Sequence, residues 1–343
     1  TAAAKASFMA LLEGEFPGRV DVELPGGEVA SMVVFPGEMT TDSSSCVVIK
    51  DAGDDPDVTH AREIGCKLSR SAHPGVHFHR GRGVGVVIMP GLQVEVGEPA
   101  INPAPRTMIT GALEKLSEAY EEEPAFDVEP FIPGGEELAR KTFNPRVGVE
   151  GGLSVLGTTG RVVPFSNEAF VASIAQQLSV LASNGAEELV LTSGKRSENN
   201  VRQEFSHLPA MAFVHFGNLI GPTLEKAVEY GFGKIHLVIR FGKGVKLAAG
   251  NLDTHSRHVS FDPEFLAGIA ATCGVTPEQT ARIKNQKLAN AVPDILPFHQ
   301  YPCFYFTVAR SCYDVCKPLL SDDAQLRVVL MINDHHRVVV PEN

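Results

Sequence analysis

Residues 234–250 read KIHLVIRFGKGVKLAAG, and this stretch decides the fold class of the second half of the chain. KIHLVIR is apolar at most positions, which is typical of a strand. A turn with glycine follows, and GVKLAAG has the spacing of a short helix that closes at Gly250. The stretch therefore predicts one strand–turn–helix unit.

Similar units precede it from about Val147 onward. Strands are expected at 151–156, 187–194, 209–218 and 234–242, the first followed by the glycine-rich turn GTTG, and helices at 167–185, 199–205, 221–231 and 242–250. Four such units in a row predict a parallel, right-handed α/β sheet. The tail is mostly helical until 326–333 and 336–341, which have the pattern of a closing hairpin.

The first part of the chain mixes short strands with helices. Strands are expected at 19–25, 28–34, 43–50, 83–91 and 125–133, and helices at 107–123 and 134–142. The change of pattern falls near KTFNPRVG, residues 141–148. We therefore expect two domains: an N-terminal mixed α+β domain, residues 1–146, on the substrate side, and a C-terminal Rossmann-like parallel α/β domain, residues 147–343.

Composition excludes some classes of function. A chain of 343 residues with 43% apolar residues is long enough for two domains with real cores. No apolar run approaches about 20 residues, so no membrane span is expected. A net charge of −11 argues against a general nucleic-acid binder. The start of the chain lacks a signal-peptide pattern, and the six cysteines form no CxxC, so we expect reduced thiols and a cytoplasmic protein.

The stretch KDAGDDPDVTH, residues 50–60, places four aspartates within seven residues. A calcium EF-hand starting at Asp51 would need Gly and Glu where Pro56 and Arg62 stand, so that reading fails. A helix start fits better, with Asp55 as the cap and Asp57 in the first turn. That account leaves Lys50, Asp51 and Asp54 unexplained, so a ligand-binding loop remains an alternative.

Several further stretches could bind a ligand. Glycines in GTTG, Gly157–Gly160, could let backbone amides approach a ligand, although a tight turn explains them equally well. Arg106 and Arg146 each follow an Asn-Pro turn that would present a guanidinium stiffly, unless they only tie loops to the core. Lys243 and Lys246, together with the following THS at residues 254–256, could also bind a ligand. An ordinary capped helix would explain this stretch equally well. His77 and His79 lack further ligands at metal spacing, so no metal site is expected.

Taken together these stretches resemble the CbiD family, the cobalt-precorrin-5B C1-methyltransferases of anaerobic cobalamin (vitamin B12) biosynthesis. The resemblance runs from Ala2 to about Ser256 in family order, through AAAKA, KDAGDDPDVTH, GVGVVIMPGL, GEPAINPAPR, GEELARKTFNPRVGVEGGLSVLGTTG, GNLIG and GKGVKLAAGNLDTHS. Three features depart from it. The Thr-Thr-Gly stretch before the alanine run is absent, TSGKRSEN is looser than the usual glycine-rich form, and Arg240 stands where the family has histidine.

The resemblance implies methyl transfer from S-adenosylmethionine, a cosubstrate, to C1 of a corrinoid that brings its own cobalt. Because GTTG follows a predicted strand, we expect the cosubstrate at Gly157, Thr158, Thr159 and Gly160. We also expect catalytic roles for Asp54 and His60. Expected corrinoid contacts are Lys50, Asp51, Arg106, Lys141, Arg146, Lys243 and His255. A homo-oligomer is possible, and neither nucleic acid nor membrane is an expected partner.

Two other readings remain open. A non-catalytic tetrapyrrole-binding or carrier protein would need basic groups around the ring but no adenosylmethionine site. A nucleotide-dependent enzyme would use GTTG for phosphate.

Overall fold

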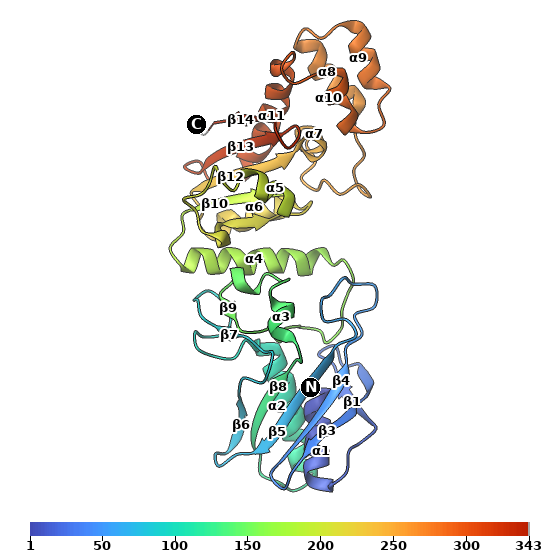
Figure 1. The fold of residues 1–343 in the computed structure, drawn as a ribbon, viewed down its shortest axis with the longest axis vertical. Coiled ribbons are helices and arrows are strands. Elements are labelled where there is room, and N and C mark those ends of the chain that lie inside the picture. The colour runs from blue at the N-terminus through green and yellow to red at the C-terminus, as the bar shows by residue number, and fades with distance from the viewer. Residues whose placement is uncertain (342–343) are drawn as a thin grey trace. The chain divides into compact units, whose positions relative to one another are not determined.

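The computed structural model describes residues 1–341, which form two compact units (Figure 1). The first unit runs from Thr1 to Ser166, and the second begins at Asn167. The protein is thus of mixed α and β structure, as the sequence predicts, with a different sheet in each unit.

The main sheet of the first unit has the strand order β3-β4-β5-β8-β6. Its strands are β3 (Phe35–Met39), β4 (Ser43–Ile49), β5 (Glu63–Arg70), β6 (Gly75–Phe78) and β8 (Ala125–Phe131). All neighbours are antiparallel except β6 and β8. Two helices, α1 (Ala2–Glu13) and α2 (Pro103–Ala119), cover one face, where Phe8, Leu113 and Phe126 are buried.

Smaller elements complete this unit. They are the hairpin β1 (Arg19–Glu23) and β2 (Val29–Val33), the pair β7 (Val86–Val87) and β9 (Val149–Glu150), α3 (Gly135–Ala139) and η1 (Asn144–Arg146). After β9, Leu153 bridges Val84 and Val155 bridges Ile101. These pairings hold the chain beyond residue 147 in the first unit, so the units divide at Ser166, later than the change of sequence pattern at residue 146.

The sheet of the second unit has the strand order β11-β10-β12-β13-β14. Its strands are β10 (Glu188–Thr192), β11 (Phe213–His215), β12 (Lys234–Arg240), β13 (Gln325–Met331) and β14 (Arg337–Val340). The first four are parallel, and β14 pairs antiparallel with β13, which confirms the predicted closing hairpin.

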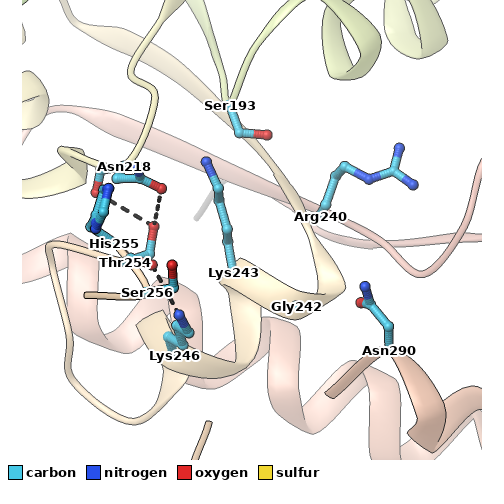
Figure 2. Close-up of a pocket in the computed structure, with 10 residues that line it drawn as sticks. All are labelled: Ser193, Asn218, Arg240, Gly242, Lys243, Lys246, Thr254, His255, Ser256 and Asn290. Atoms are coloured by element: carbon cyan, nitrogen blue, oxygen red, sulfur yellow. Dashed lines mark hydrogen bonds between the residues drawn. The ribbon is translucent and has the colours of Figure 1, made fainter. Parts of the chain in front are cut away.

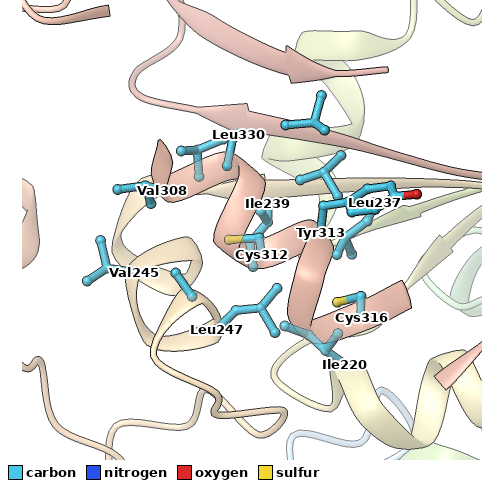
Figure 3. Close-up of a cluster of buried hydrophobic side chains, with 14 of the residues drawn as sticks. Ile220, Leu237, Ile239, Val245, Leu247, Val308, Cys312, Tyr313, Cys316 and Leu330 are labelled. Carbon is cyan, nitrogen blue, oxygen red and sulfur yellow. The ribbon is translucent and has the colours of Figure 1, made fainter. Parts of the chain in front are cut away.

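Both faces of this sheet are buried, because successive side chains of a strand point to opposite faces and most of them are apolar here. Leu237 and Ile239 of β12 face one core, and Val238 faces the other. Figure 3 shows the larger core, where α7 (Phe241–Ala248) and α11 (Pro302–Cys316) meet the sheet. The other helices of the second unit include α4 (Asn167–Ser183), α6 (Ile220–Glu229), α8 (Pro263–Thr272), α9 (Pro277–Lys284), η3 (Ala289–Ala291), α10 (Val292–Ile295) and η4 (Lys317–Leu319). α5 (Lys195–Val201) and η2 (Ala210–Ala212) follow β10.

Three sequence predictions are wrong in the structure. Residues 50–62 contain no helix, because they form the loop that joins the antiparallel strands β4 and β5. Gly157–Gly160 do not follow a strand of the parallel sheet, because the preceding residues pair within the first unit. The expected strand at 83–91 shrinks to β7, two residues long. The helix expected at 199–205 exists but is displaced toward the N-terminus, as α5.

The cysteines are of two kinds. Cys312 and Cys316 lie one helical turn apart on α11, and both are buried in the core. Cys273 and Cys303 lie at disulfide separation, with Cα atoms 5.7 Å apart, a pairing that the sequence analysis did not anticipate. Within residues 1–341, the structure has no helix of sufficient length and apolarity to cross a bilayer, nor a cluster of three metal-binding side chains.

Candidate functional site

The carboxyl ends of β10, β11 and β12 border a cavity of about 360 Å³ (Figure 2). The chain leaves β10 toward one side of the sheet and returns to its other side as β12, and open α/β sheets bind ligands at such a reversal. We call this cavity the basic pocket. Its lining residues are Ser193, Asn218, Arg240, Gly242, Lys243, Lys246, Thr254, His255, Ser256 and Asn290.

Two lysines from α7 enter the basic pocket. Lys243 and Lys246 are three residues apart, so the helix presents both on one side. The Lys243 ammonium donates to the backbone carbonyl of Gly217, and Lys246 Nζ donates to the carbonyl of Thr254 at 3.1 Å. Burial lowers the pKa of Lys243, and the charge of Lys246 lowers it further. Neither lysine forms an ion pair within the described part of the chain.

The loop after α7 supplies the opposite wall. Thr254 is almost fully buried and donates its amide to Asn218 O at 3.0 Å, which ties this loop to the end of β11. His255 donates its amide to Asp253 Oδ1 at 2.8 Å, and His258 Nδ1 lies 3.0 Å from Asp253 Oδ2. The loop therefore holds the His255 side chain at the pocket through its backbone.

Arg240 ends β12 and forms the far wall of the pocket (Figure 2). Its Nη1 donates to Asp334 Oδ1 at 2.9 Å, and Asp334 also accepts from Arg196 and Asn200. These donors, Arg196 first, hold the pKa of the Asp334 carboxyl well below its usual range. An added Cβ at Gly242 would lie 3.0 Å from Asn290 Oδ1, so glycine leaves this side of the pocket open.

The structure thus brings together two of the predicted residues, Lys243 and His255. The sequence analysis did not propose Ser193, Asn218 or Asn290. Ser193 directly follows β10 and Asn218 lies shortly after the end of β11, so the strand-end rule could have found them. Asn290 comes from a distant short helix, and no local pattern marks it.

The acidic loop, residues 50–62, is closed by its own contacts. Lys50 Nζ lies 2.5 Å from Asp57 Oδ2 and donates to Thr59 Oγ1 at 2.8 Å. Burial raises the pKa of the Asp57 carboxyl, but hydrogen bonds from Lys50 and Thr59 outweigh it and hold the pKa below its usual range. His60 Nδ1 accepts from the Ala52 amide at 3.1 Å. Lys50 and His60 are therefore engaged in the loop.

The remaining aspartates face outward. Asp51 accepts from the Gly53 amide at 2.8 Å, which is a local turn, and Asp54 is exposed. Asp55 Oδ1 accepts from the Phe165 amide at 3.3 Å. Because of this last contact the acidic loop lies beside the segment 156–166, which contains GTTG.

This glycine-containing segment is anchored but open. Arg161 pairs with Glu28 of the first hairpin turn, Nε to Oε2 at 3.0 Å. Gly157 has φ +127° and no atom within 4 Å of an added Cβ, so its backbone faces open space. Several apolar side chains of the segment are exposed, namely Leu156, Val162, Val163 and Phe165.

Arg106 lies in the first turn of α2 and is engaged by the fold. Its Nε donates to Ile101 O at 2.9 Å, and its Nη2 donates to Glu98 at 3.2 Å and Pro99 O at 3.3 Å. Its guanidinium also lies over the Phe78 ring, 5.3 Å from the centroid. Arg146 lies 6.0 Å from the Phe143 ring centroid, and Lys141 is exposed.

Comparison with known proteins gives a consistent result. The family described as "CbiD" matches residues 1–164, and "CbiD, C-terminal domain" matches residues 253–341. Proteins named cobalt-precorrin-5B C(1)-methyltransferase are similar over most of the chain. The one from Prosthecochloris aestuarii is 41% identical, covering 92% of this chain and 87% of its own. The one from Burkholderia cenocepacia strain J2315 is 42% identical, covering 94% and 89%.

A solved structure is also similar. The crystal structure of the cobalamin biosynthesis protein cbiD from Archaeoglobus fulgidus shares 28% identity, with a TM-score of 0.40 over 75% of this chain and 79% of that chain.

Proposed function

Because this chain belongs to the CbiD family, we propose that it transfers a methyl group from S-adenosylmethionine to C1 of cobalt-precorrin-5B, giving cobalt-precorrin-6A. The observation that carries the proposal is the identity near 40% to relatives with that name across both units. The cobalt belongs to the substrate.

The proposed reaction breaks the sulfonium–methyl bond and forms a bond between that methyl and C1, leaving adenosylhomocysteine. The electron-rich ring carbon is the nucleophile, so the protein need not supply one. The tasks of the chain are in-line alignment and exclusion of water. A carboxylate against the sulfonium would stabilise the reactant, whose positive charge is lost on transfer. We therefore propose that Asp54 and His60 position the cosubstrate by contacting parts of it that are distant from the sulfonium.

The charges of the first unit suit the cosubstrate. S-adenosylmethionine has a sulfonium and an ammonium against one carboxylate, so it is a net cation. The acidic loop presents Asp51 and Asp54 beside the glycine-containing segment. We propose that these carboxylates take the ammonium or the ribose hydroxyls, while Gly157–Gly160 offer backbone amides. The exposed apolar side chains of the same segment could cover the adenine.

The charges of the second unit suit the other substrate. A precorrin carries carboxylate side chains around its ring, so it is a polyanion, and Lys243 and His255 line a pocket with no carboxylate among its lining residues. The charges therefore favour the corrinoid on the second unit, the reverse of the assignment expected from sequence. The strand order of this unit, with β10 between β11 and β12, supports a Rossmann-like, doubly wound fold.

The other predicted corrinoid contacts rest on less. Lys141 is exposed and remains a proposed donor, as does Arg146. Lys50 and Arg106 already donate within the fold, so we propose that they support their loops and contact substrate only secondarily.

The test is a methyl-transfer assay with cobalt-precorrin-5B and isotopically labelled S-adenosylmethionine, read by mass spectrometry. The proposal expects one labelled methyl group on the corrinoid and release of adenosylhomocysteine. A carrier protein would bind the corrinoid without transfer. A thermal-shift measurement with ATP distinguishes the methyltransferase from a nucleotide-dependent enzyme, because only the second hypothesis expects ATP to stabilise the protein.

Calorimetry with adenosylhomocysteine tests the cosubstrate site. Gly157→Val should weaken binding, because a side chain would shield the amides and valine disfavours a positive φ. Gly97→Val is the matched control, since Gly97 also has a positive φ, φ +93°, and open space around it, in the same unit. Equal affinities in both variants would place the cosubstrate elsewhere.

A further inference from the structure

The strongest unexplained feature of the molecule is the pair of lysines in the basic pocket. Lys243 and Lys246 are both partly buried, and each ammonium donates one hydrogen bond to a neutral backbone carbonyl. An ammonium has three donors, so each lysine has further donors for another partner. Holding two like charges together and partly away from water is unfavourable unless an anion joins them.

The third cation of the pocket already has a carboxylate partner. Arg240 stands where the family resemblance expects histidine, so this chain has a permanent charge there. Asp334, in the turn between β13 and β14, pairs with Arg240 and also with Arg196. Among the described residues, the cations of the pocket that lack a carboxylate partner are therefore the two lysines.

The remaining lining decides which kind of anion fits. Hydroxyls and amides surround the lysines, from Ser193, Asn218, Thr254, Ser256 and Asn290, and the lining contains no aromatic ring except His255. An adenosyl group would need a surface for adenine and an acceptor for the ribose diol. A carboxylate needs only donors of this kind. A cavity of about 360 Å³ with an open mouth admits a side chain of a macrocycle, while the ring itself stays outside.

We propose that Lys243 and Lys246 form a subsite for one side-chain carboxylate of the corrinoid, and that Asp334 keeps Arg240 from capturing a second. This inference rests on the proposed function for the identity of the ligand. The pocket fixes the orientation of the ring by one arm, through donors anchored on Gly217 and Thr254.

The methionyl carboxylate of S-adenosylmethionine is the other source of the same chemistry, and binding measurements distinguish the two. The probes are cobyrinic acid, a cobalt corrinoid with free carboxylates, its methyl ester, and adenosylhomocysteine, each titrated by calorimetry into the full chain. We expect the acid to bind and the ester to bind much more weakly. Lys246→Met should weaken the acid about tenfold to a hundredfold, as loss of a bond to a charged group implies, and leave adenosylhomocysteine unchanged.

Two further variants complete the test. Lys287→Met removes an exposed lysine of the same unit, so it changes net charge equally and should leave acid binding unchanged. Asp334→Asn should tighten acid binding severalfold, because it releases the charge of Arg240. Weaker binding in this variant would show that Asp334 only braces the wall and would overturn its proposed role.

The outcomes are separable from failure of the proposed function. If Lys246→Met loses adenosylhomocysteine and keeps the acid, the pocket takes the methionyl carboxylate and the inference is wrong. If the wild type binds acid and ester equally, or binds neither, the inference is also wrong, even when methyl transfer proceeds. Absence of methyl transfer with normal acid binding would instead refute the enzymatic function and leave the subsite intact.

Discussion

The acidic loop and the basic pocket both gather like charges, but the fold treats them differently. In the acidic loop Asp57 pairs with Lys50, and Asp51 and Asp55 accept backbone amides. In the basic pocket, among the described residues, Lys243 and Lys246 donate to neutral carbonyls and to no carboxylate. Charge that the fold compensates internally stabilises structure, whereas charge left partly buried without compensation indicates a ligand. Mutations should therefore change stability in opposite directions at the two places.

The largest change in stability is expected at Arg106, a cation whose hydrogen bonds go to groups within the fold. Arg106→Ala removes a donor to the buried Ile101 carbonyl and the contact with Phe78, so unfolding free energy should fall by about 2–3 kcal/mol. Denaturant unfolding measures it, and corrinoid affinity is measured at two salt concentrations. A stable variant that loses corrinoid binding would make Arg106 a ligand donor after all.

Asp57→Asn should be the next in size. The variant weakens the hydrogen bonds from Lys50 and Thr59 and leaves the Lys50 ammonium without its partner, which should cost about 1–2 kcal/mol given partial exposure. Asp55→Asn is the control, because its single bond to Phe165 is long and exposed. Asp54→Asn should keep stability and reduce turnover. Full activity in that variant would make the whole loop structural.

These contrasts also show what could be read from the sequence. The apolar run in β12 predicts a buried strand, because burial follows residue type locally. The Asp55-Pro56-Asp57 pattern is compatible with a helix cap, and only the pairing of β4 with β5 makes it a hairpin loop. That pairing depends on contacts far apart in the chain, which no local pattern encodes.

The candidate site divides in the same way. Lys243 could be selected because it follows a predicted strand end. That Arg240 pairs with Asp334, from a turn 94 residues away, depends on the closing hairpin and could not be foreseen. The uncompensated charge of the two lysines is therefore a property of the fold and becomes visible only in three dimensions.

In the basic pocket, removing a charged side chain should raise stability, the opposite of the effect in the acidic loop. Lys243→Met removes a partly buried charge that has no counterion within the described residues, so the ligand-free protein should gain stability, by no more than about 1 kcal/mol. Thermal unfolding of the wild type and the variant measures it near neutral pH. Lys287→Met should give no change. A clear loss of stability in Lys243→Met would mean that the pocket lysines are structural, like those of the acidic loop.

The smallest effect is the pH dependence of that gain, and its sign follows from the lowered pKa of Lys243. The folded state binds this proton less tightly than the unfolded state does, so the charged form destabilises the fold below the folded pKa. As pH rises through the folded pKa toward the ordinary lysine value of about 10.4, folded protein loses the proton first and the penalty disappears. Stabilisation by Lys243→Met should therefore be full at neutral pH and vanish toward alkaline pH.

Binding of cobyrinic acid should follow the same pH range. A bound carboxylate favours the ammonium form of Lys243, so the affinity should fall as pH rises, and it should fall at a lower pH than for a lysine with an ordinary pKa. Unfolding curves and calorimetry from neutral to alkaline pH measure both trends. A gain that stays constant across this range would show that Lys243 carries no uncompensated charge, and the contrast between the two regions would then fail.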